Sequence, residues 1–158
     1  MLRRATQRGF SYIELLVALT VLMVLASAAV PVAHWDEKRR REARLRVTLS
    51  LMRDAIDQYK KYADEGLIIQ EDVEQVGYPP SLEDLVDGVD VGDPQSAESR
   101  TLRFLQRIPV DPITEKAEWG LRSYQDDFDS EQWGGENVWD VYSLSDKRAL
   151  DGTYYFEW

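Results

Sequence analysis

The chain has 158 residues, of which 30% are charged and 44% hydrophobic, and its formal net charge at neutral pH is -10. This length suits one modest domain with a membrane segment, and the negative charge disfavours binding to nucleic acid or to anionic lipid head groups. The chain contains no cysteine, which excludes disulfide bonds and thiolate metal sites.

The first nine residues form a short basic segment with three arginines and no acid. An apolar stretch follows from Phe10 to Ala33, and its single charged side chain is Glu14. About 20 apolar residues are enough to cross the hydrocarbon layer of a bilayer, so residues 10–33 are predicted to be a transmembrane helix. The leading arginines favour a cytoplasmic N-terminus and an exported remainder, although Arg39–Arg41 beyond the far end oppose this orientation.

Glu14 is the one acid inside this predicted segment. A charged group in the hydrocarbon layer costs about 2.5–3.5 kcal/mol even on the milder insertion scales, so an acid there is a functional hypothesis that needs a partner. A buried charge without a partner is the costly state, whereas a buried pair serves specificity. We therefore expect Glu14 to be paired in the working form of the protein.

The run from Gly9 to Leu19, GFSYIELLVAL, closely resembles the N-terminal signature of type IV prepilins and type II secretion pseudopilins. The resemblance implies that a dedicated prepilin peptidase cuts between Gly9 and Phe10, which makes residues 1–9 a leader peptide. The same enzyme would then methylate the new amine of Phe10. In the assembled filament Glu14 would meet the Phe10 amine of a neighbouring subunit.

Beyond the apolar stretch the pattern becomes amphipathic over residues 34–63. Apolar side chains recur there at spacings of three and four, namely Leu45, Leu49, Met52, Ile56, Tyr59 and Ala63. Such a stripe predicts a helix with one face in a core, and a continuous helix over residues 10–62 would be roughly 80 Å long. The resemblance makes Pro31 the helix-kinking proline, and because proline removes a backbone hydrogen bond we expect a kink or local break there.

Residues 64–109 are predicted to be a long connection with short helices. Ser81 follows a proline-containing break and precedes two acids, a pattern typical of a helix start, which predicts a helix over residues 81–86. A second short helix is expected from about Ser99 to Arg107, with its apolar residues facing inward. Residues 78–85 and 108–112 resemble the corresponding stretches of major pseudopilins.

Residues 110–158 are predicted to form a small antiparallel sheet. Two runs rich in aromatic and β-branched residues, 119–124 and 138–143, are separated by an acidic loop that contains glycine, and residues 154–158 are expected to add a third strand. The tryptophans of this region are expected to pad the sheet against the helix, with a sugar or peptide platform as the alternative; they are Trp119, Trp133, Trp139 and Trp158. The predicted class is α+β, with a long N-terminal helix packed on the sheet, and the resemblance implies a pilin-like fold.

The loop from Leu144 to Thr153 is a candidate calcium site. Carboxylates and backbone carbonyls are the oxygen ligands that Ca²⁺ prefers, but the spacing here is not that of an EF-hand. The preceding DVYSL (residues 140–144) resembles the start of the calcium loop of major pseudopilins. The resemblance implies side-chain ligation by Asp146 and Asp151 and carbonyl ligation by Leu144 and Thr153.

A solvated hairpin is the alternative for this loop, because it is shorter than the loop of the family and contains Lys147 and Arg148. A second, less specific acidic cluster lies earlier in the chain and consists of Asp126, Asp127, Asp129 and Glu131.

An enzyme is not predicted. His34 is the only histidine, and the chain has no cysteine and no nucleophile elbow. Carboxylate pairs such as Asp126 and Asp127 could support acid–base chemistry, but clustered surface acids in so acidic a chain are more often simply solvated. There is no phosphate-binding glycine loop and no basic patch with interleaved aromatics, so nucleotide or nucleic-acid binding gains no support.

The sequence therefore predicts a structural filament subunit, which the resemblance specifies as the major pseudopilin of a type II secretion system. It would wait in the bacterial inner membrane as a single-pass protein with a periplasmic C-terminal domain, and then assemble into a periplasmic pseudopilus that drives protein export. The implied partners are further copies of the chain, the prepilin peptidase and N-methyltransferase, an inner-membrane assembly platform and minor pseudopilins. The alternatives are a type IV pilin of an extracellular pilus and a membrane-tethered binding or catalytic domain.

Overall fold

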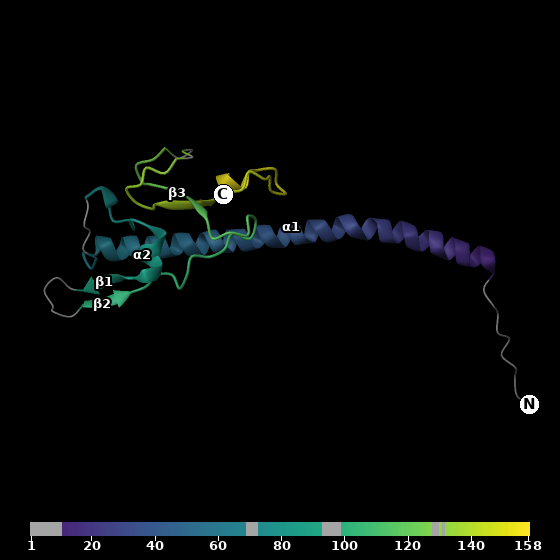
Figure 1. The fold of residues 1–158 in the computed structure, drawn as a ribbon, viewed down its shortest axis with the longest axis horizontal. Helices are drawn as coiled ribbons and strands as arrows, with labels where there is room; N and C mark the ends of the chain where they lie inside the picture. Colours follow the sequence, from purple (N-terminus) through teal and green to yellow (C-terminus); the bar gives the residue numbers. More distant parts are fainter. Residues whose placement is uncertain (1–10, 69–72, 93–98, 128–129, 131) are drawn as a thin grey trace, which may run out of the picture. The chain divides into compact units, whose positions relative to one another are not determined.

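The computed structural model describes residues 11–68, 73–92, 99–127, 130 and 132–158. Its helices are α1 (Tyr12–Asp64) and α2 (Leu82–Asp87), with short 3₁₀ helices η1 (Val73–Gln75) and η2 (Tyr155–Glu157). Its strands are β1 (Val89–Gly92), β2 (Ser99–Leu102), β3 (Trp119–Arg122) and β4 (Asp140–Ser143) (Figure 1). A long N-terminal helix with small antiparallel sheets confirms the predicted α+β class, and the arrangement is consistent with a pilin-like fold.

The chain divides into an N-terminal unit, Met1–Arg39, and a C-terminal unit, Arg40–Trp158. Helix α1 contributes to both units as one uninterrupted element. The predicted break at Pro31 is therefore wrong, since the helical hydrogen bonding continues past the proline, and the kink stays a prediction. In the N-terminal unit the helix begins at the edge of the described residues, so the leader and the Gly9–Phe10 bond lie outside them.

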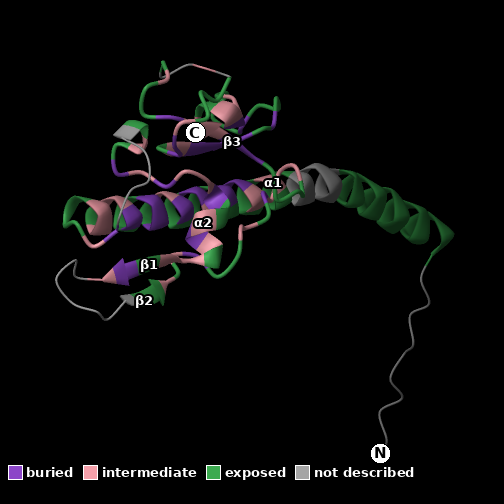
Figure 2. Ribbon diagram, turned by 60° about the vertical axis from the view of Figure 1, so that its left-hand side comes forward, coloured by how far each residue is buried: buried purple, intermediate pink, exposed green. Residues whose placement is uncertain are grey.

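In the C-terminal unit the predicted apolar stripe of α1 is confirmed. Its members Leu45, Leu49, Met52, Ile56 and Tyr59 are each at most 3% exposed. Residues three and four apart lie on one helix face, and Figure 2 shows buried positions recurring along this part of α1. The face belongs to one core cluster with residues from most of the other described elements. The buried residues that pack with the stripe include Leu82 and Leu85 of α2, Val91 of β1, Leu105, Trp119 of β3, Val138, Val141 of β4 and Tyr155 of η2.

The short helix predicted over residues 81–86 is confirmed as α2. Ser81 is its N-cap: the Ser81 hydroxyl oxygen accepts a hydrogen bond from the backbone N–H of Asp84 at 3.3 Å, which satisfies one of the free N–H groups of the first turn. Gly88 ends the helix with φ at +93°, a backbone conformation that only glycine adopts without strain.

The second predicted helix, Ser99–Arg107, is wrong. Its first residues form strand β2, which pairs antiparallel with β1 so that Leu102 faces Val89 and Ser99 faces Gly92. Beyond the strand, the backbone N–H groups of Phe104 and Leu105 both donate to the carbonyl of Leu85, which leaves them without the bonds of a helix. Pairing with the preceding strand β1 outweighs a weak local helix propensity here.

Strands β3 and β4 confirm the first two predicted strands. They pair antiparallel with Trp119 opposite Ser143 and Arg122 opposite Asp140. The ring of Tyr142 packs directly on Gly120, where a Cβ atom would lie 2.2 Å from the ring. Glycine at this position therefore leaves the room that the Tyr142 ring occupies over β3.

The predicted third strand, residues 154–158, is wrong. Tyr154 makes only an isolated bridge to Arg148, and the chain then turns into η2. The carboxylate of Glu157 accepts a hydrogen bond from the backbone N–H of Tyr154 at 2.9 Å, which closes the turn from within and withdraws that N–H from strand pairing. The described strands thus form two separate two-stranded sheets.

A matched pair of leucines tests the role of the stripe. Leu49→Ala removes a side chain that is 2% exposed, whereas Leu51→Ala removes one that is 53% exposed on the same helix. Leu49→Ala is expected to lower the free energy of unfolding by about 2–5 kcal/mol, and Leu51→Ala should stay within about 0.5 kcal/mol. Denaturant unfolding of the unassembled protein measures both changes, and equal effects would contradict the assigned helix face.

Candidate functional site

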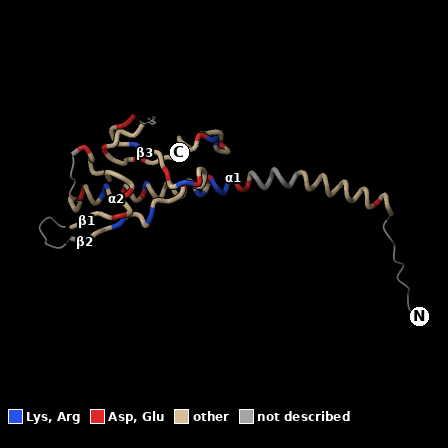
Figure 3. Tube along the Cα trace, in the orientation of Figure 1, with Lys and Arg blue, Asp and Glu red and all other residues tan. Residues whose placement is uncertain are grey.

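The N-terminal unit exposes a helix that is apolar on all sides. From Tyr12 to Leu25 the large apolar side chains are 39–78% exposed (Figure 2), and Figure 3 shows this part of the trace as almost free of charge. A helix that is hydrophobic all round is normally buried in a larger protein body or in lipid. Over the described residues, however, no helix reaches the combination of length and hydropathy needed to cross a membrane. The membrane segment 10–33 accordingly stays a prediction.

Glu14 lies in the first turn of α1 and is exposed. An acid in the first turn interacts favourably with the positive end of the helix dipole, so this position suits the helix even without another partner. The predicted partner, the amine of Phe10 in a neighbouring subunit, involves a residue outside the described ranges. The roles of Gly9, Phe10 and Glu14 in cleavage, methylation and assembly therefore stay predictions.

The predicted calcium loop folds as a hairpin. The backbone N–H of Ala149 donates to the carbonyl of Thr153 at 2.8 Å, and that of Tyr155 donates to the carbonyl of Lys147 at 3.3 Å. Asp146 precedes the paired segment, whereas Asp151 lies in the turn at its tip. The paired segment thus separates Asp146 from Asp151.

The oxygens of the hairpin tip are also engaged by protein donors. Asp151 Oδ1 accepts hydrogen bonds from the hydroxyl of Thr153 at 2.7 Å and from its backbone N–H at 3.0 Å. These bonds hold the pKa of the Asp151 carboxyl below its ordinary value of 3.8. The carbonyl of Thr153 accepts from Ala149, and Leu144 is 53% exposed. Within the described ranges no group of three or more histidines or carboxylates could hold a metal ion.

Glu42 of α1 fastens this hairpin to the helix. Its side chain is only 6% exposed, and its Oε1 atom accepts hydrogen bonds from the Leu150 N–H at 2.8 Å and from the Tyr155 hydroxyl at 2.9 Å. Burial, followed by this hydrogen bond, raises the pKa of the Tyr155 hydroxyl well above its ordinary value of 10.0. Both donors come from the last part of the chain, so one buried acid connects α1 to the hairpin and to η2.

Arg46, one turn further along α1, reaches the same region. Its guanidinium group lies 4.3 Å from the ring centroid of Trp158 and 3.5 Å from Asp151 Oδ2. Arg46, Asp151 and Trp158 line one part of an open groove of about 570 Å³ between α1 and the C-terminal segment. The groove is lined by Arg46, Leu49, Ser50, Arg53, Asp54, Asp151, Thr153, Glu157 and Trp158.

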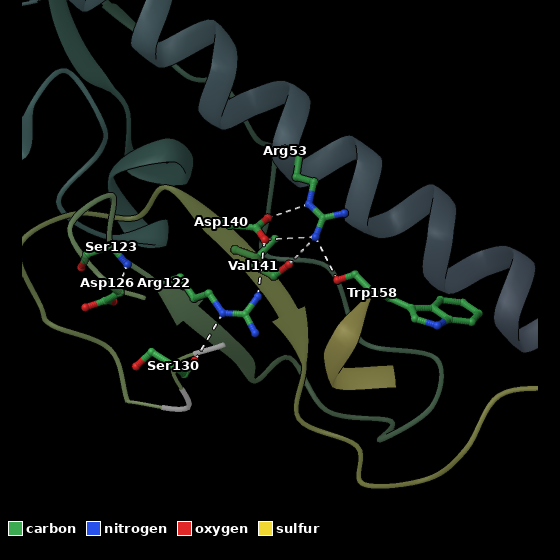
Figure 4. A network of polar contacts seen from close by, with 8 residues as sticks. All are labelled: Arg53, Arg122, Ser123, Asp126, Ser130, Asp140, Val141 and Trp158. Atoms are coloured by element: carbon green, nitrogen blue, oxygen red, sulfur yellow. Dashed lines mark hydrogen bonds and ion pairs between the residues drawn. The ribbon is translucent and has the colours of Figure 1, made fainter. Parts of the chain in front are cut away.

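Arg53 makes the densest polar contact between α1 and the sheet (Figure 4). Its Nε donates to Asp140 Oδ1 at 2.6 Å, and one terminal nitrogen donates to Asp140 Oδ2, to the carbonyl of Val141 at 3.1 Å and to the carbonyl of Trp158 at 2.9 Å. Arg122 of β3 approaches the same carboxylate at 3.8 Å. Forked guanidinium–carboxylate bonds are among the stronger polar contacts in proteins, so Arg53 holds β4 and the C-terminal segment against α1.

Asp111 is a second buried acid and is completely inaccessible to solvent. Its Oδ1 accepts from the Ile113 N–H at 2.7 Å and its Oδ2 from the hydroxyl of Ser143 at 2.6 Å. The Ser143 hydroxyl oxygen in turn accepts from the Ser145 N–H at 3.2 Å. This chain of bonds joins the segment before β3 to the end of β4, where the hairpin begins.

The second acidic cluster is only partly described, since Asp129 and Glu131 lie outside the described residues. Asp126 Oδ2 accepts from the backbone N–H groups of Ser123 at 2.7 Å and Gly134 at 3.2 Å. Glu136 Oε2 is buried and has no hydrogen-bond partner among the described residues. Both carboxylates lie beside Gly134, because a Cβ there would be 2.2 Å from Glu136 Oε2 and 2.8 Å from Asp126 Oδ1. Asp126 therefore organises the loop between β3 and β4.

The tryptophans divide between core and surface. Trp119 is 8% exposed, whereas Trp133 and Trp139 are both 40% exposed. Trp139 lies edge-on to Tyr124 at 6.3 Å between ring centroids, and Tyr124 stacks on Tyr78 at 5.8 Å. The predicted padding role holds for Trp119, while Trp139 belongs to a small aromatic surface cluster.

Sequence reasoning missed the charged residues of α1 that hold the C-terminal segment. Glu42 lies three residues before Leu45 and so continues the phase of the apolar stripe, where a buried acid needs donors. Arg46, Arg53 and Lys60 recur every seven residues, which places them along one side of that stripe. Lys60 makes a contact of the same kind, because its Nζ atom lies 5.5 Å from the centroid of the Tyr78 ring. The phase of Glu42 with the apolar stripe and the seven-residue spacing of the basic residues were the sequence signals for these contacts.

Comparison with known proteins gives one family match. Residues 4–30 match the prokaryotic N-terminal methylation motif. No curated protein and no solved structure matches the chain. The match indicates a type IV pilin-like, prepilin-type protein, and it covers the segment that contains Gly9, Phe10 and Glu14.

Substitution of Arg53 tests its role as the tie between α1 and β4. Arg53→Met keeps much of the apolar stem but removes every hydrogen bond to Asp140, Val141 and Trp158, so the free energy of unfolding should fall by about 1–2 kcal/mol. Arg44→Met is the control, because Arg44 is an exposed arginine on the same helix. Urea unfolding of both variants measures the difference, and a loss no larger than that of Arg44→Met would show that the network contributes no stability.

Neighbouring tyrosines test the buried acid. Tyr155→Phe removes a donor from Glu42 and should lower the free energy of unfolding by about 1–3 kcal/mol, whereas Tyr154→Phe removes only an exposed bond from Arg148.

Burial raises the pKa of Tyr59 to about 12, and that of Tyr155 is raised as well. In the unfolded chain the tyrosine hydroxyls ionise at a lower pH than in the folded protein. The contribution of these two residues to the free energy of unfolding is therefore fully present below pH 10 and falls as the pH rises from about 10 to 12. Denaturant unfolding across this range should show a shallower fall for Tyr155→Phe than for Tyr154→Phe.

Proposed function

We propose that the chain is a structural filament subunit that assembles through the N-terminal half of α1. The observation that carries the proposal is the contrast between the two halves of this helix. The C-terminal half buries its apolar stripe in its own unit, whereas the N-terminal half exposes apolar side chains on all sides. Helices of the second kind are covered by lipid or by other protein, and the methylation motif at residues 4–30 supports both a membrane-stored and an assembled state.

Glu14 would set the register of assembly. In a stack of apolar helices an acid is costly unless a cation meets it, and cleavage at Gly9 would create such a cation at the amine of Phe10. Only one axial offset between neighbouring helices satisfies both groups, so the pair would select a single packing arrangement. Buried ion pairs in other systems serve specificity in the same way.

The finer assignment is the major pseudopilin of a type II secretion system, in the inner membrane with its C-terminal domain in the periplasm. It is supported by the resemblance of residues 78–85 and 140–144 to major pseudopilins and by the absence of the cysteine pair with which many type IV pilins close their last loop. The partners would be the prepilin peptidase, an inner-membrane assembly platform and minor pseudopilins. A type IV pilin is the second candidate, since the methylation motif is shared by both groups.

One experiment tests both processing and assembly. The chain is produced together with a prepilin peptidase and an assembly system, and the mature N-terminus is analysed by mass spectrometry. Wild-type protein and Glu14→Leu are both expected to begin at methylated Phe10, because the cleaved bond is unchanged. Glu14→Leu should lose at least about tenfold in filament yield, as expected for about 1.4 kcal/mol of lost pairing per subunit.

Thr20→Val is the matched control, because the Thr20 hydroxyl donates to the Val17 carbonyl at 2.8 Å and is satisfied within its own helix. It should assemble like wild type. An intact Met1 would rule out prepilin processing, and normal filaments from Glu14→Leu would rule out the pairing. Filaments confined to the periplasm would favour the pseudopilin, and filaments outside the cell would favour the pilin.

A further inference from the structure

The hairpin at residues 147–155 occupies the place where the family resemblance implies calcium, but its residues do not fit a bound ion. A calcium site needs several oxygens at about 2.3–2.6 Å from one point. Asp146 and Asp151 lie at opposite ends of the paired segment, and the Thr153 carbonyl accepts from Ala149. Asp151 Oδ1 already accepts two hydrogen bonds from Thr153.

We propose that this hairpin is closed by protein cations and by a buried acid, and that its folding does not depend on a divalent cation. The cations are the guanidinium groups of Arg46, which approaches Asp151 from α1, and of Arg148, which lies within the hairpin. The acid is Glu42. This inference concerns the fold of the C-terminal unit and is independent of the proposed filament function.

Each arginine contacts a different side of the hairpin. Arg46 lies between Asp151 Oδ2, at 3.5 Å, and the ring of Trp158, at 4.3 Å from its centroid, so it joins the hairpin tip to the last residue. Arg148 donates to the Gly152 carbonyl at 3.3 Å and to the Tyr154 hydroxyl at 2.6 Å, and its guanidinium carbon lies 4.3 Å from the Tyr154 ring centroid. The Arg46 guanidinium supplies positive charge to the Asp151 carboxylate much as a metal ion would, but with fixed donors.

Glu42 supplies the link between the hairpin and the helix. Its Oε1 atom receives the Leu150 N–H of the hairpin tip and the Tyr155 hydroxyl of the hairpin base. The tip, the base and the last residue are therefore all bonded to α1 through Glu42 and Arg46, four residues apart on the same helix. No oxygen of Asp146 takes part in these bonds.

Hydrogen exchange of the hairpin amides tests the proposal directly. The N–H groups of Ala149, Leu150, Thr153 and Tyr155 all donate hydrogen bonds, so their exchange rates report closure of the hairpin. In the full chain in detergent, their rates are expected to be the same with excess calcium chloride and with excess EGTA. Arg46→Gln should speed exchange about three- to tenfold, and Asp146→Asn should change nothing.

Arg44→Gln is the control for loss of a helix arginine and should exchange like wild type. Slower exchange of the hairpin amides with calcium would overturn the proposal, as would wild-type rates in Arg46→Gln. A calcium effect confined to residues 123–137 would locate an ion near Asp126 and Glu136 and would leave the hairpin independent of metal, as proposed.

Discussion

The buried face of α1 is the constraint on which the C-terminal unit depends. The described strands form only two-stranded sheets, and an isolated pair of strands is at best marginally stable in water. Each pair gains its stability from apolar side chains that it places on the helix, such as Val91 from one sheet and Val141 from the other. The described part of the unit is therefore organised as paired strands and loops packed on one helix, and its strands form no continuous sheet.

Charged residues beside that face determine how the hairpins are placed. Apolar contacts are not directional, so the stripe alone would tolerate small shifts of β4 along the helix. Arg53 removes this freedom, because its fork meets Asp140 while the same group bonds the carbonyls of Val141 and Trp158. Glu42 likewise fixes the position of the C-terminal hairpin, because its Oε1 atom accepts from the Leu150 N–H and the Tyr155 hydroxyl. Burial thus supplies the free energy of folding, and these polar contacts supply the register.

Local patterns predicted the elements whose environment is local. The stripe of α1, the cap at Ser81 and the strands β3 and β4 follow from residues within one or two turns or within one strand. The β1–β2 pairing and η2 were not predicted. Strand β2 forms because Leu102 pairs with Val89 of another segment. Residues 154–158 are aromatic and so resemble a strand, but the bond of Glu157 to the Tyr154 N–H closes them into η2. The partners of Glu42, Leu150 and Tyr155, are separated from it by 108 and 113 residues in the sequence, so these contacts likewise require the folded structure.

The interactions that hold the C-terminal hairpin closed determine how its stability depends on ion concentration, ionic strength and pH. A loop held by a bound ion has a stability that varies with the logarithm of the ion concentration. A loop held by Arg46, Arg148 and Glu42 carries its cations within the chain, so its stability depends on ionic strength and pH instead.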